Sequence, residues 1–361
     1  LLFDYLGLTP TGKLTGTGAA STDAEVLKKL AEEHPIPGVI LDIRQKSKIK
    51  NTYLDKIIPA LDKDQRIRTG FNLTSTTSGR LSSSGKINMQ QLPRDNAAVK
   101  GCIKAKPGYK ILQQDLATAE VYVAAILSDD KNLQNVFKSG GDLHSTVAKM
   151  VFALPHDVAD IKEKASTQRQ AAKAITFGIM YGSGPAKVAE TVTKDSGKPF
   201  SIQQAKDTIA KYFRTFPRLK DWLQMSKEDI EANGYIYSIL GRKRRLPNVF
   251  SNDKGIASHE VRSGINFLIQ SVASDINLLA GIELNQWIKD NNKDAVIIAL
   301  VHDSLVLEVA DKDVKEVSEI MAKFTQKDRG CSIPGQPIGV DLDIGDDYAF
   351  SKFDKQYPEF L

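Results

Sequence analysis

Two apolar runs near the C-terminus, at 295–301 and 305–310, are separated only by His302, Asp303 and Ser304. This spacing predicts a tight β-hairpin whose turn carries the polar residues. A carboxylate buried without a partner is costly, so Asp303 must lie near water, a hydrogen-bond donor or a metal ion. The turn is therefore the first candidate for a functional site.

Helical patterning dominates the first part and the middle of the chain. A capping box, Thr22 to Glu25, starts one helix, and a second is expected over about 37–60. Helices are expected almost throughout 142–233 and again over about 258–291. The expected breaks are Pro35, Pro155, Gly182 and Pro217.

Strand patterning is confined to short segments. Residues 68–93, rich in Ser, Thr, Gly and Asn, predict turns and short strands. A strand at 109–114 gives way to a helix from about Thr118, a hairpin with a basic turn follows at 234–247, and a last strand lies within 338–350. Strands on both sides of a helical middle predict an α+β fold with a discontinuous core.

Composition narrows the class of protein only slightly. The 361 residues are 26% charged and 41% hydrophobic, as in soluble globular proteins, and the net charge of +5 permits a polyanionic partner without requiring one. Cys102 and Cys331 have no metal-ligand or disulfide-framework spacing, which favours a reducing compartment. The lack of an apolar run of about 18 residues argues against a membrane span. The start at Leu1, without Met, indicates a piece of a longer protein.

Two carboxylates, Asp115 and Asp303, each come where a predicted strand ends. Together at the rim of one sheet they would repel each other unless a divalent metal neutralised them. Two Mg²⁺ ions held in this way activate a hydroxyl and stabilise the leaving oxygen in a phosphoryl displacement. The alternative is that Asp115 caps the following helix and Asp303 only makes a turn.

A stripe of two cations and two aromatic rings marks the helix around residue 175. Arg169, Lys173, Phe177 and Tyr181 recur at every fourth position and form one drifting face about 18 Å long. Such a face suits a ligand with phosphates at one end and a flat ring at the other. A half-buried amphipathic helix is the alternative, but it leaves the two cations unexplained.

These segments resemble the polymerase portion of a family A DNA polymerase, and their details are more similar to phage replicases than to bacterial repair polymerases. Three motifs stand in order: DLATAE at 115–120, RQAAKAITFGIMYG at 169–182 and VHDS at 301–304. Further matching segments are TPTGKL, SGRLSSSGKINMQQLP, GGDLHS, GYIYSILGRKRRLP and RSGINFLIQSVASDI. The resemblance runs from about Leu8 to the C-terminal strand.

The resemblance implies a right-hand polymerase fold with an antiparallel palm sheet and helical fingers. A partial thumb is expected at 1–65, the palm at 66–140 and 257–361, and the fingers at 141–256. The implied reaction is template-directed DNA synthesis, in which dNTPs are added to a primer 3′ end with release of pyrophosphate.

Catalytic roles implied by the resemblance fall on Asp115, Asp303 and Lys173. The two aspartates would bind two Mg²⁺ ions, for which Mn²⁺ can substitute. Glu120 resembles the residue whose buried carboxylate leaves no room for a ribose 2′-OH, so deoxynucleotides would be selected.

Nucleotide binding is implied for the helical stripe and one histidine. Arg169 and Lys173 would hold the triphosphate together with His144 of GGDLHS, although a lone histidine is more often a surface or helix-cap residue. Phe177 would pack on the sugar, and Tyr181 would stack near the templating base.

Primer–template contacts are implied for a set of polar residues, several of which would test base-pair shape from the minor groove. They are Arg80, Asn88, Gln91, Arg262, Asn266, Gln270 and His302. Arg262 would bind the template backbone or pair with an acidic neighbour. The basic turn at 242–245 would lie near phosphate or, as the alternative, form a solvated turn.

Two departures from the family pattern leave alternatives open. Ser304 stands where the third motif usually has Glu, and HDS is also typical of single-subunit RNA polymerases. Glu120 and Phe177 argue for DNA synthesis instead. The presence of Asp115, Asp303 and Lys173 argues against a catalytically decayed template-binding module. The first motif also carries Thr118 in place of an amide side chain.

The expected partners are primer–template DNA and dNTPs, with no membrane, for a monomeric enzyme in the cytoplasm of a bacterium or a phage-infected host. A proofreading exonuclease is not expected in this chain, because its one Asp-x-Glu, at 23–25, is explained by helix capping.

Overall fold

The computed structural model describes residues 1–93 and 96–350 and divides into two compact units. Unit 1 comprises Leu1–Phe71 and Ser83–Ile103, and unit 2 comprises Asn72–Ser82 and the chain from Lys104 onward. The end of the predicted second palm segment, 351–361, lies outside the described residues.

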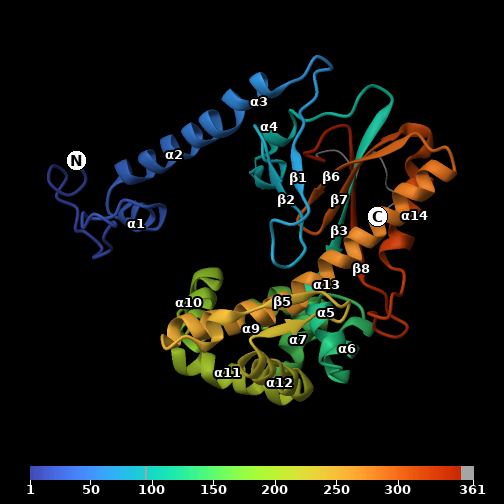
Figure 1. Ribbon diagram of the computed structural model, residues 1–361. Helices are drawn as coiled ribbons and strands as arrows, with labels where there is room; N and C mark the ends of the chain where they lie inside the picture. Colours follow the sequence, from blue (N-terminus) through green and yellow to red (C-terminus); the bar gives the residue numbers. More distant parts are fainter. Residues whose placement is uncertain (94–95, 351–361) are drawn as a thin grey trace. The chain divides into compact units, whose positions relative to one another are not determined.

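Unit 1 contains one long helical stretch, shorter helices and turns (Figure 1). Its helical elements are α1 (Ala24–Leu30), α2 (Pro35–Ile49), the π-helical η1 (Lys50–Leu54), α3 (Asp55–Ala60), the 3₁₀ turn η2 (Met89–Gln91) and α4 (Ala97–Lys100). The predicted second helix is therefore confirmed, with a π-helical segment inside it. A two-stranded sheet, β1 (Gly70–Asn72) with β2 (Ser82–Ser84), confirms the short strands expected there.

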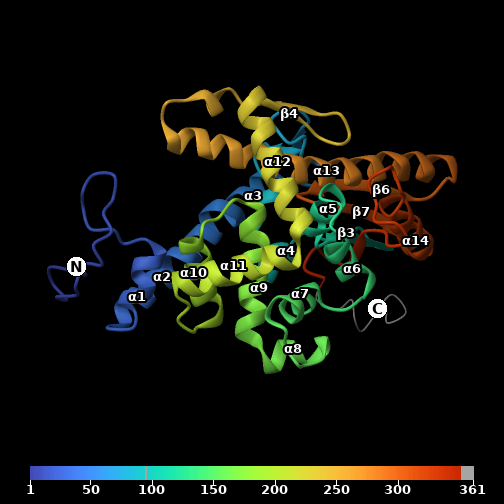
Figure 2. The same cartoon turned by 90° about the horizontal axis from the view of Figure 1, so that it is seen from below.

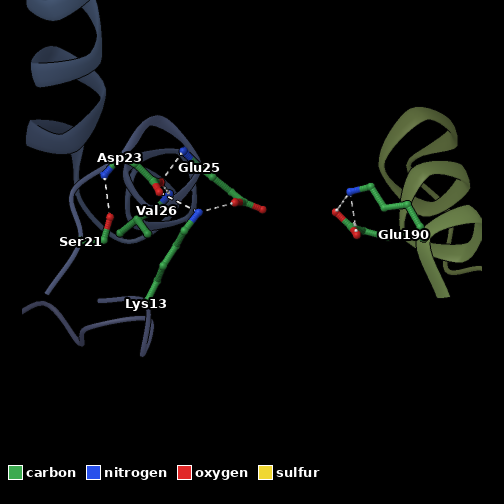
Figure 3. A network of polar contacts seen from close by, with 7 residues as sticks. Lys13, Ser21, Asp23, Glu25, Val26 and Glu190 are labelled. Carbon is green, nitrogen blue, oxygen red and sulfur yellow. Dashed lines mark hydrogen bonds and ion pairs between the residues drawn. The ribbon is translucent and has the colours of Figure 1, made fainter. Parts of the chain in front are cut away.

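The start of α1 differs from the predicted capping box. Asp23, not Thr22, is the cap, because one of its carboxylate oxygens accepts from the backbone N–H groups of Glu25 and Val26 at 3.0 Å each. Lys13 forms ion pairs with Asp23 at 2.7 Å and with Glu25 at 3.1 Å (Figure 3). The hydrogen bond from Lys13, followed by that from Val26, lowers the pKa of Asp23 to about 2.

Unit 2 is mostly helical, and Figure 2 shows α7, α9, α10 and α11 close together in its bundle. The helical elements are α5 (Ala119–Leu127), α6 (Lys131–Lys138), α7 (Leu143–Phe152), α8 (Val158–Lys164), α9 (Ser166–Met180), α10 (Pro185–Ser196), α11 (Ile202–Thr215), α12 (Pro217–Asn233), η3 (Pro247–Phe250), α13 (Lys254–Asp290), η4 (Asp311–Asp313) and α14 (Val314–Thr325). Tyr122, Tyr212 and Phe216 are fully buried in the core of the bundle. The predicted run of interrupted helices is confirmed.

A four-stranded antiparallel sheet is the second layer of unit 2, with strand order β6-β7-β3-β8. Its strands are β6 (Ala295–Val301), β7 (Ser304–Ala310), β3 (Tyr109–Ala117) and β8 (Gly339–Gly345). Leu112, Leu305 and Leu307 on one face pack against apolar residues of α13 and α14. A separate hairpin, β4 (Tyr235–Tyr237) with β5 (Lys243–Arg245), matches the predicted basic hairpin. The expected α+β class is confirmed.

The long helix α13 meets the length and composition of a membrane span, the one helix of the described residues to do so, which the sequence analysis did not anticipate. However, 67% of its most apolar window is buried inside the protein. Core helices of soluble proteins have the same composition, so this feature is weak evidence for a membrane.

Close packing of α13 against α12 and η3 requires a glycine at 264. A Cβ at Gly264 would lie 2.6 Å from Ile230 Cδ1 and 2.7 Å from Leu246 Cδ1. Gly264→Ala is therefore expected to lower the free energy of unfolding by about 1–3 kcal/mol, because the core must shift to admit the methyl group. Urea unfolding followed by fluorescence reports on unit 2, which holds both tryptophans, Trp222 and Trp287.

The matched control is Ser263→Ala, a neighbouring change on the same helix at a half-buried position. Equal stability of the two variants would contradict the packing argument.

Candidate active site

The hairpin between β6 and β7 is as tight as the sequence predicts. Val301 pairs with Ser304, so His302 and Asp303 are the two residues of the turn. His302 has φ +54°, in the left-handed region that two-residue hairpin turns require and that non-glycine residues seldom adopt. The turn exposes the His302 side chain and leaves Asp303 half-buried, whereas Ser304 belongs to β7 and is buried.

Asp115 lies within β3, because the strand runs three residues beyond its predicted end. The interpretation of Asp115 as a helix cap is wrong: the residue before α5 is Thr118, with φ +50° and no capping hydrogen bond. Asp115 lies opposite Ser304 in the β3–β7 ladder, and the Ser304 hydroxyl donates to its Oδ1. Gln113 Nε2 donates to its Oδ2 at 2.9 Å. The ladder therefore places Asp115 and Asp303 one residue apart across two strands.

Asp303 binds a guanidinium group. Arg80 Nη2 lies 2.9 Å from Oδ1 and 2.8 Å from Oδ2 of Asp303, and both side chains are about three-quarters buried. From the sequence, Asp303 was expected near water, a hydrogen-bond donor or a metal ion. In the structure its partner is a hydrogen-bond donor that also carries a positive charge. An ion pair to a residue far away in the sequence also shows that Asp303 does more than form a turn.

The two aspartates fit a divalent cation. Hard carboxylate oxygens suit Mg²⁺, which proteins usually bind through one or two carboxylates with phosphate and water oxygens completing the shell. Within residues 1–93 and 96–350, no group of three or more His, Cys, Asp or Glu is arranged to hold a metal with protein ligands alone. Asp115 and Asp303 would therefore hold Mg²⁺ together with the phosphates of a substrate.

The face of α9 predicted to bind a nucleotide is the one turned away from the core. Its opposite face is buried through Ala171, Ala172, Ile175, Thr176, Ile179 and Met180. Arg169 and Phe177 are half-buried, Lys173 is exposed, and Tyr181 follows directly after the helix with 38% of its surface exposed. The stripe is thus the accessible side of a half-buried helix, which agrees with either interpretation of the sequence.

Arg169 is fixed by a carboxylate that the sequence analysis did not single out. Its Nε and Nη2 each donate to an oxygen of Asp142 at 2.8 Å. Asp142 also accepts from the backbone N–H of Ser145 at 2.8 Å as the cap of α7. Burial acts to raise the pKa of Asp142, but hydrogen bonds from Arg169 and Ser145 hold it well below its usual range. Asp142 lies two residues before His144 in the GGDLHS segment. Its position at the start of a predicted helix was the sequence signal that could have identified it.

His144 is buried beside this ion pair. Its ring lies 5.5 Å from that of Phe177, and its Nδ1 is buried without a hydrogen-bond partner among the described residues. Burial is the main cause that lowers the pKa of His144 to about 4; Asp142 opposes this shift, and the charges of Arg169 and Lys173 add to it. The imidazole is therefore neutral at pH 7 and has an unused polar atom.

Glu120 and Tyr181 join α5 to the end of α9. The Tyr181 hydroxyl donates to a carboxylate oxygen of Glu120. Burial, with Glu120 beside it, raises the pKa of Tyr181 above its ordinary value, whereas Arg80 and Gln270 act in the opposite direction. Glu120 is half-buried rather than fully buried. These contacts bring together residues of four separate segments.

Three of the residues predicted to contact DNA lie on α13 at every fourth position: Arg262, Asn266 and Gln270, all half-buried. The side-chain stem of Arg262 lies against Gly182, where a Cβ would be 2.5 Å from Cγ and Cδ of Arg262. Asn266 Oδ1 is buried and has no hydrogen-bond partner among the described residues. This helix face therefore presents polar groups beside the end of α9.

Asn88 and Gln91 lie in unit 1, whereas the other predicted site residues belong to unit 2. Asn88 is used within its own turn: its Oδ1 accepts from Gln90 N, and its Nδ2 donates to the Ser83 carbonyl, both at 3.0 Å. Gln91 is exposed, and its carbonyl accepts from the Tyr53 hydroxyl at 2.7 Å. Stabilising the turn accounts for Asn88 without a ligand.

A cavity of about 230 Å³ opens between α9 and α10. Three of the four residues of the stripe line it. Its lining comprises Lys173, Ala174, Phe177, Gly178, Tyr181, Ser183, Lys187, Val188, Thr191 and Asp195.

Comparison with known proteins identifies relatives of the whole chain. The family model described as DNA polymerase family A matches residues 1–349. The DNA polymerase of Escherichia phage T5 is 49% identical over 99% of this chain and 45% of its own length, and the thermostable DNA polymerase I of Thermus aquaticus is 33% identical over 98% and 41%. A solved structure, the POL domain of Pol1 from M. smegmatis in complex with DNA primer-template and dNTP, superposes with a TM-score of 0.84 at 28% identity, covering 97% of this chain and 59% of that one.

The chain belongs to DNA polymerase family A. The predicted resemblance is thereby confirmed, and the higher identity to the phage enzyme agrees with the expected likeness to phage members. The chain spans less than half the length of these two curated relatives.

His144 should make the protein sensitive to acid. The unfolded chain binds a proton at His144 below pH 6.5, but the folded chain does so only below about pH 4. Between these values the unfolded state binds more protons, so stability is full above pH 6.5 and falls as the pH decreases. From pH 7 to pH 5, wild type should lose about 1–2 kcal/mol more unfolding free energy than His144→Gln.

Urea unfolding at the two pH values measures this difference, and His259→Gln, a change at an exposed histidine of α13, is the control. An identical acid sensitivity of wild type and His144→Gln would contradict the burial of a neutral imidazole.

Proposed function

We propose that this chain catalyses template-directed DNA synthesis, adding dNTPs to a primer 3′ end with release of pyrophosphate. The observation that carries the proposal is the placement of Asp115 and Asp303 one residue apart across the β3–β7 ladder. Family membership and the M. smegmatis complex with primer-template and dNTP support it. In this proposal unit 1 contains the thumb (1–65), and unit 2 contains the fingers (141–256) and most of the palm.

The acidic residues would act on the reacting phosphate. Two Mg²⁺ ions, held by Asp115 and Asp303, would supply activation of the primer hydroxyl and stabilisation of the leaving oxygens. Ser304 keeps the Asp115 carboxylate oriented through its hydroxyl. Arg80 neutralises Asp303 until a divalent cation takes its place.

The triphosphate would bind along α9 and α7. Arg169 has a planar fork suited to phosphate oxygens, and Lys173 adds an exposed charge that can follow the transferring group. His144 lies near these charges, and its Nδ1 has no hydrogen-bond partner among the residues that the structure describes. A triphosphate would raise the pKa of His144, because negative charge favours the imidazolium form.

Sugar and base would contact the other half of the same surface. Phe177 lines the cavity and would pack on the sugar, and Tyr181 borders the same cavity, where a base would stack. Glu120 would occupy the space beside the sugar and exclude a 2′-OH. Gln270 and Arg80, near Tyr181, would read the minor groove, where donors meet similar acceptors in every correct pair.

RNA synthesis is the second candidate, because the HDS sequence at 302–304 also resembles the corresponding motif of single-subunit RNA polymerases. The hydrogen bond between Tyr181 and Glu120 favours DNA synthesis, since it holds a carboxylate in place at the proposed sugar site. Membership in a DNA polymerase family favours it as well.

Removing either metal-binding carboxylate should abolish synthesis. Asp115→Asn and Asp303→Asn are expected to lower primer extension at least about 1,000-fold, because the reacting phosphates lose their charge stabilisation. Primer–template affinity should change little, because backbone phosphate contacts supply most of it. Extension of a labelled primer and fluorescence anisotropy measure the two quantities.

Asp311→Asn, at the opposite end of β7, is the matched control and should retain activity. Turnover above a few per cent in either Asp115→Asn or Asp303→Asn would rule out the assigned role.

Glu120 should determine the choice of sugar. Glu120→Ala removes the group proposed to exclude the 2′-OH, so the ratio of kcat/KM for dATP to that for ATP should fall on the order of 100-fold. The control is Tyr181→Phe, which removes the hydrogen bond to Glu120 but keeps the carboxylate. We expect a much smaller change in that variant. A wild-type ratio near one, unmoved by Glu120→Ala, would favour RNA-polymerase-like chemistry.

A further inference from the structure

The turn that carries Arg80 is supported from behind by an arginine of the basic hairpin. Gly79 has φ +80°, and a Cβ there would lie 2.4 Å from Cζ of Arg242. The Arg242 guanidinium thus fills the space where any other residue would place its side chain. The Ser274 hydroxyl donates to the Gly79 carbonyl at 3.4 Å, and the Thr76 hydroxyl donates to the Arg80 carbonyl at 2.5 Å. The backbone of the turn is therefore held at several points.

Arg242 is itself anchored to α13. Its Nη2 lies 2.6 Å from Oδ1 of Asp275, whose side chain is only 12% exposed. Lys243 is exposed with its ammonium group 3.8 Å from the centre of the Tyr235 ring, and Arg245 is exposed on the same strand. Arg244, between them, is half-buried, with its guanidinium 5.9 Å from the centre of the Phe267 ring. Arg242 therefore directs its guanidinium toward α13 and the turn at Gly79, although 39% of its side chain remains exposed.

We propose that Arg242 is a positioning residue for DNA synthesis and that it acts through Arg80. The contacts form one path: Asp275 holds Arg242, Arg242 packs on Gly79, and the next residue, Arg80, reaches Asp303. A long arginine side chain loses much rotamer entropy when it is fixed in one conformation. A rigid backbone at Gly79 and Arg80 therefore increases the population of Arg80 conformers in which the guanidinium reaches the site. The inference rests on the proposed function for its kinetic part only.

The kinetic test is a double-mutant cycle of Arg80→Ala, Arg242→Ala and the double variant. Arg242→Ala alone should lower kcat for correct dNTP addition about 10-fold or more, while the Kd for primer–template changes less than about threefold. In the Arg80→Ala background the same change should cost less than about twofold, because the residue through which it acts is gone. Arg245→Ala, the matched control on the same hairpin, should have the same effect in both backgrounds.

Two further variants separate positioning from loss of folding. Gly79→Ala forces a methyl group against the Arg242 guanidinium and should reproduce the Arg242→Ala defect in kcat. Arg242→Lys keeps the charge but not the planar group on Gly79, and it should restore less than half of the lost rate. Thermal unfolding within a few degrees of wild type shows that each variant folds. Equal costs of Arg242→Ala with and without Arg80 would overturn the inference.

A readout without catalysis keeps this inference distinct from the proposed function. The rate at which phenylglyoxal modifies Arg80, followed by mass spectrometry of the unliganded protein, should increase at least threefold in Arg242→Ala and stay unchanged in Arg245→Ala. Primer extension by wild type tests the proposed function alone. An unchanged modification rate in Arg242→Ala would overturn the positioning role, whether or not the wild type extends a primer.

Discussion

The register of the β3–β7 ladder is the constraint on which the site depends. It sets Asp115 opposite Ser304 and therefore next to the turn residue Asp303. A slip of one residue would turn Asp115 toward the face that packs on α13 and α14, because side chains alternate between the faces of a sheet. That face is lined by Leu112, Leu305 and similar residues, so burial of apolar surface opposes such a slip. The hydrophobic core thus fixes where the carboxylates lie.

Carboxylates held this close need compensation, and the structure provides it with arginine. Within the part of the chain that the structure describes, three Asp–Arg pairs occur around the site: Asp303 with Arg80, Asp142 with Arg169 and Asp275 with Arg242. In the first two pairs the arginine is a proposed ligand-binding residue, so a substrate must compete with a carboxylate for it. Such competition costs affinity, but it keeps each guanidinium oriented before the substrate arrives, which lowers the entropy lost on binding.

Most of the architecture follows from local patterns, whereas the detail of the site does not. The 295–310 hairpin and the stripe on α9 were predictable because apolar spacing and two polar turn residues act over short distances. The end of β3 was misplaced, and with it the local environment of Asp115, because pairing with β7 and β8 extends the strand past the point where its own pattern changes. Tertiary pairing outweighs local preference there.

The residues that orient the site side chains were not predictable either, because they too act through contacts between distant parts of the sequence. Asp142 lies in a segment that resembles the family, but its pairing with Arg169 spans two helices. Arg242 has the same sequence appearance as Lys243 and Arg245, and its contacts with Asp275 and Gly79 distinguish it from them. A basic run in a sequence does not say which of its members pairs with a distant carboxylate.

Ser304, where the family motif usually has Glu, changes how the negative charge of Asp115 is compensated. A glutamate there would add a third negative charge beside Asp115 and Asp303, and its repulsion would need a further cation. The serine hydroxyl instead donates to Asp115 Oδ1, while Gln113 donates to Oδ2, so both oxygens of this carboxylate have neutral donors. Arg80 then supplies the positive charge next to Asp303. Among the described residues, Asp115 thus has two neutral donors and Asp303 has a cation, so the two acids are compensated in different ways. An ionised glutamate at 304 would have no hydroxyl to donate to Asp115.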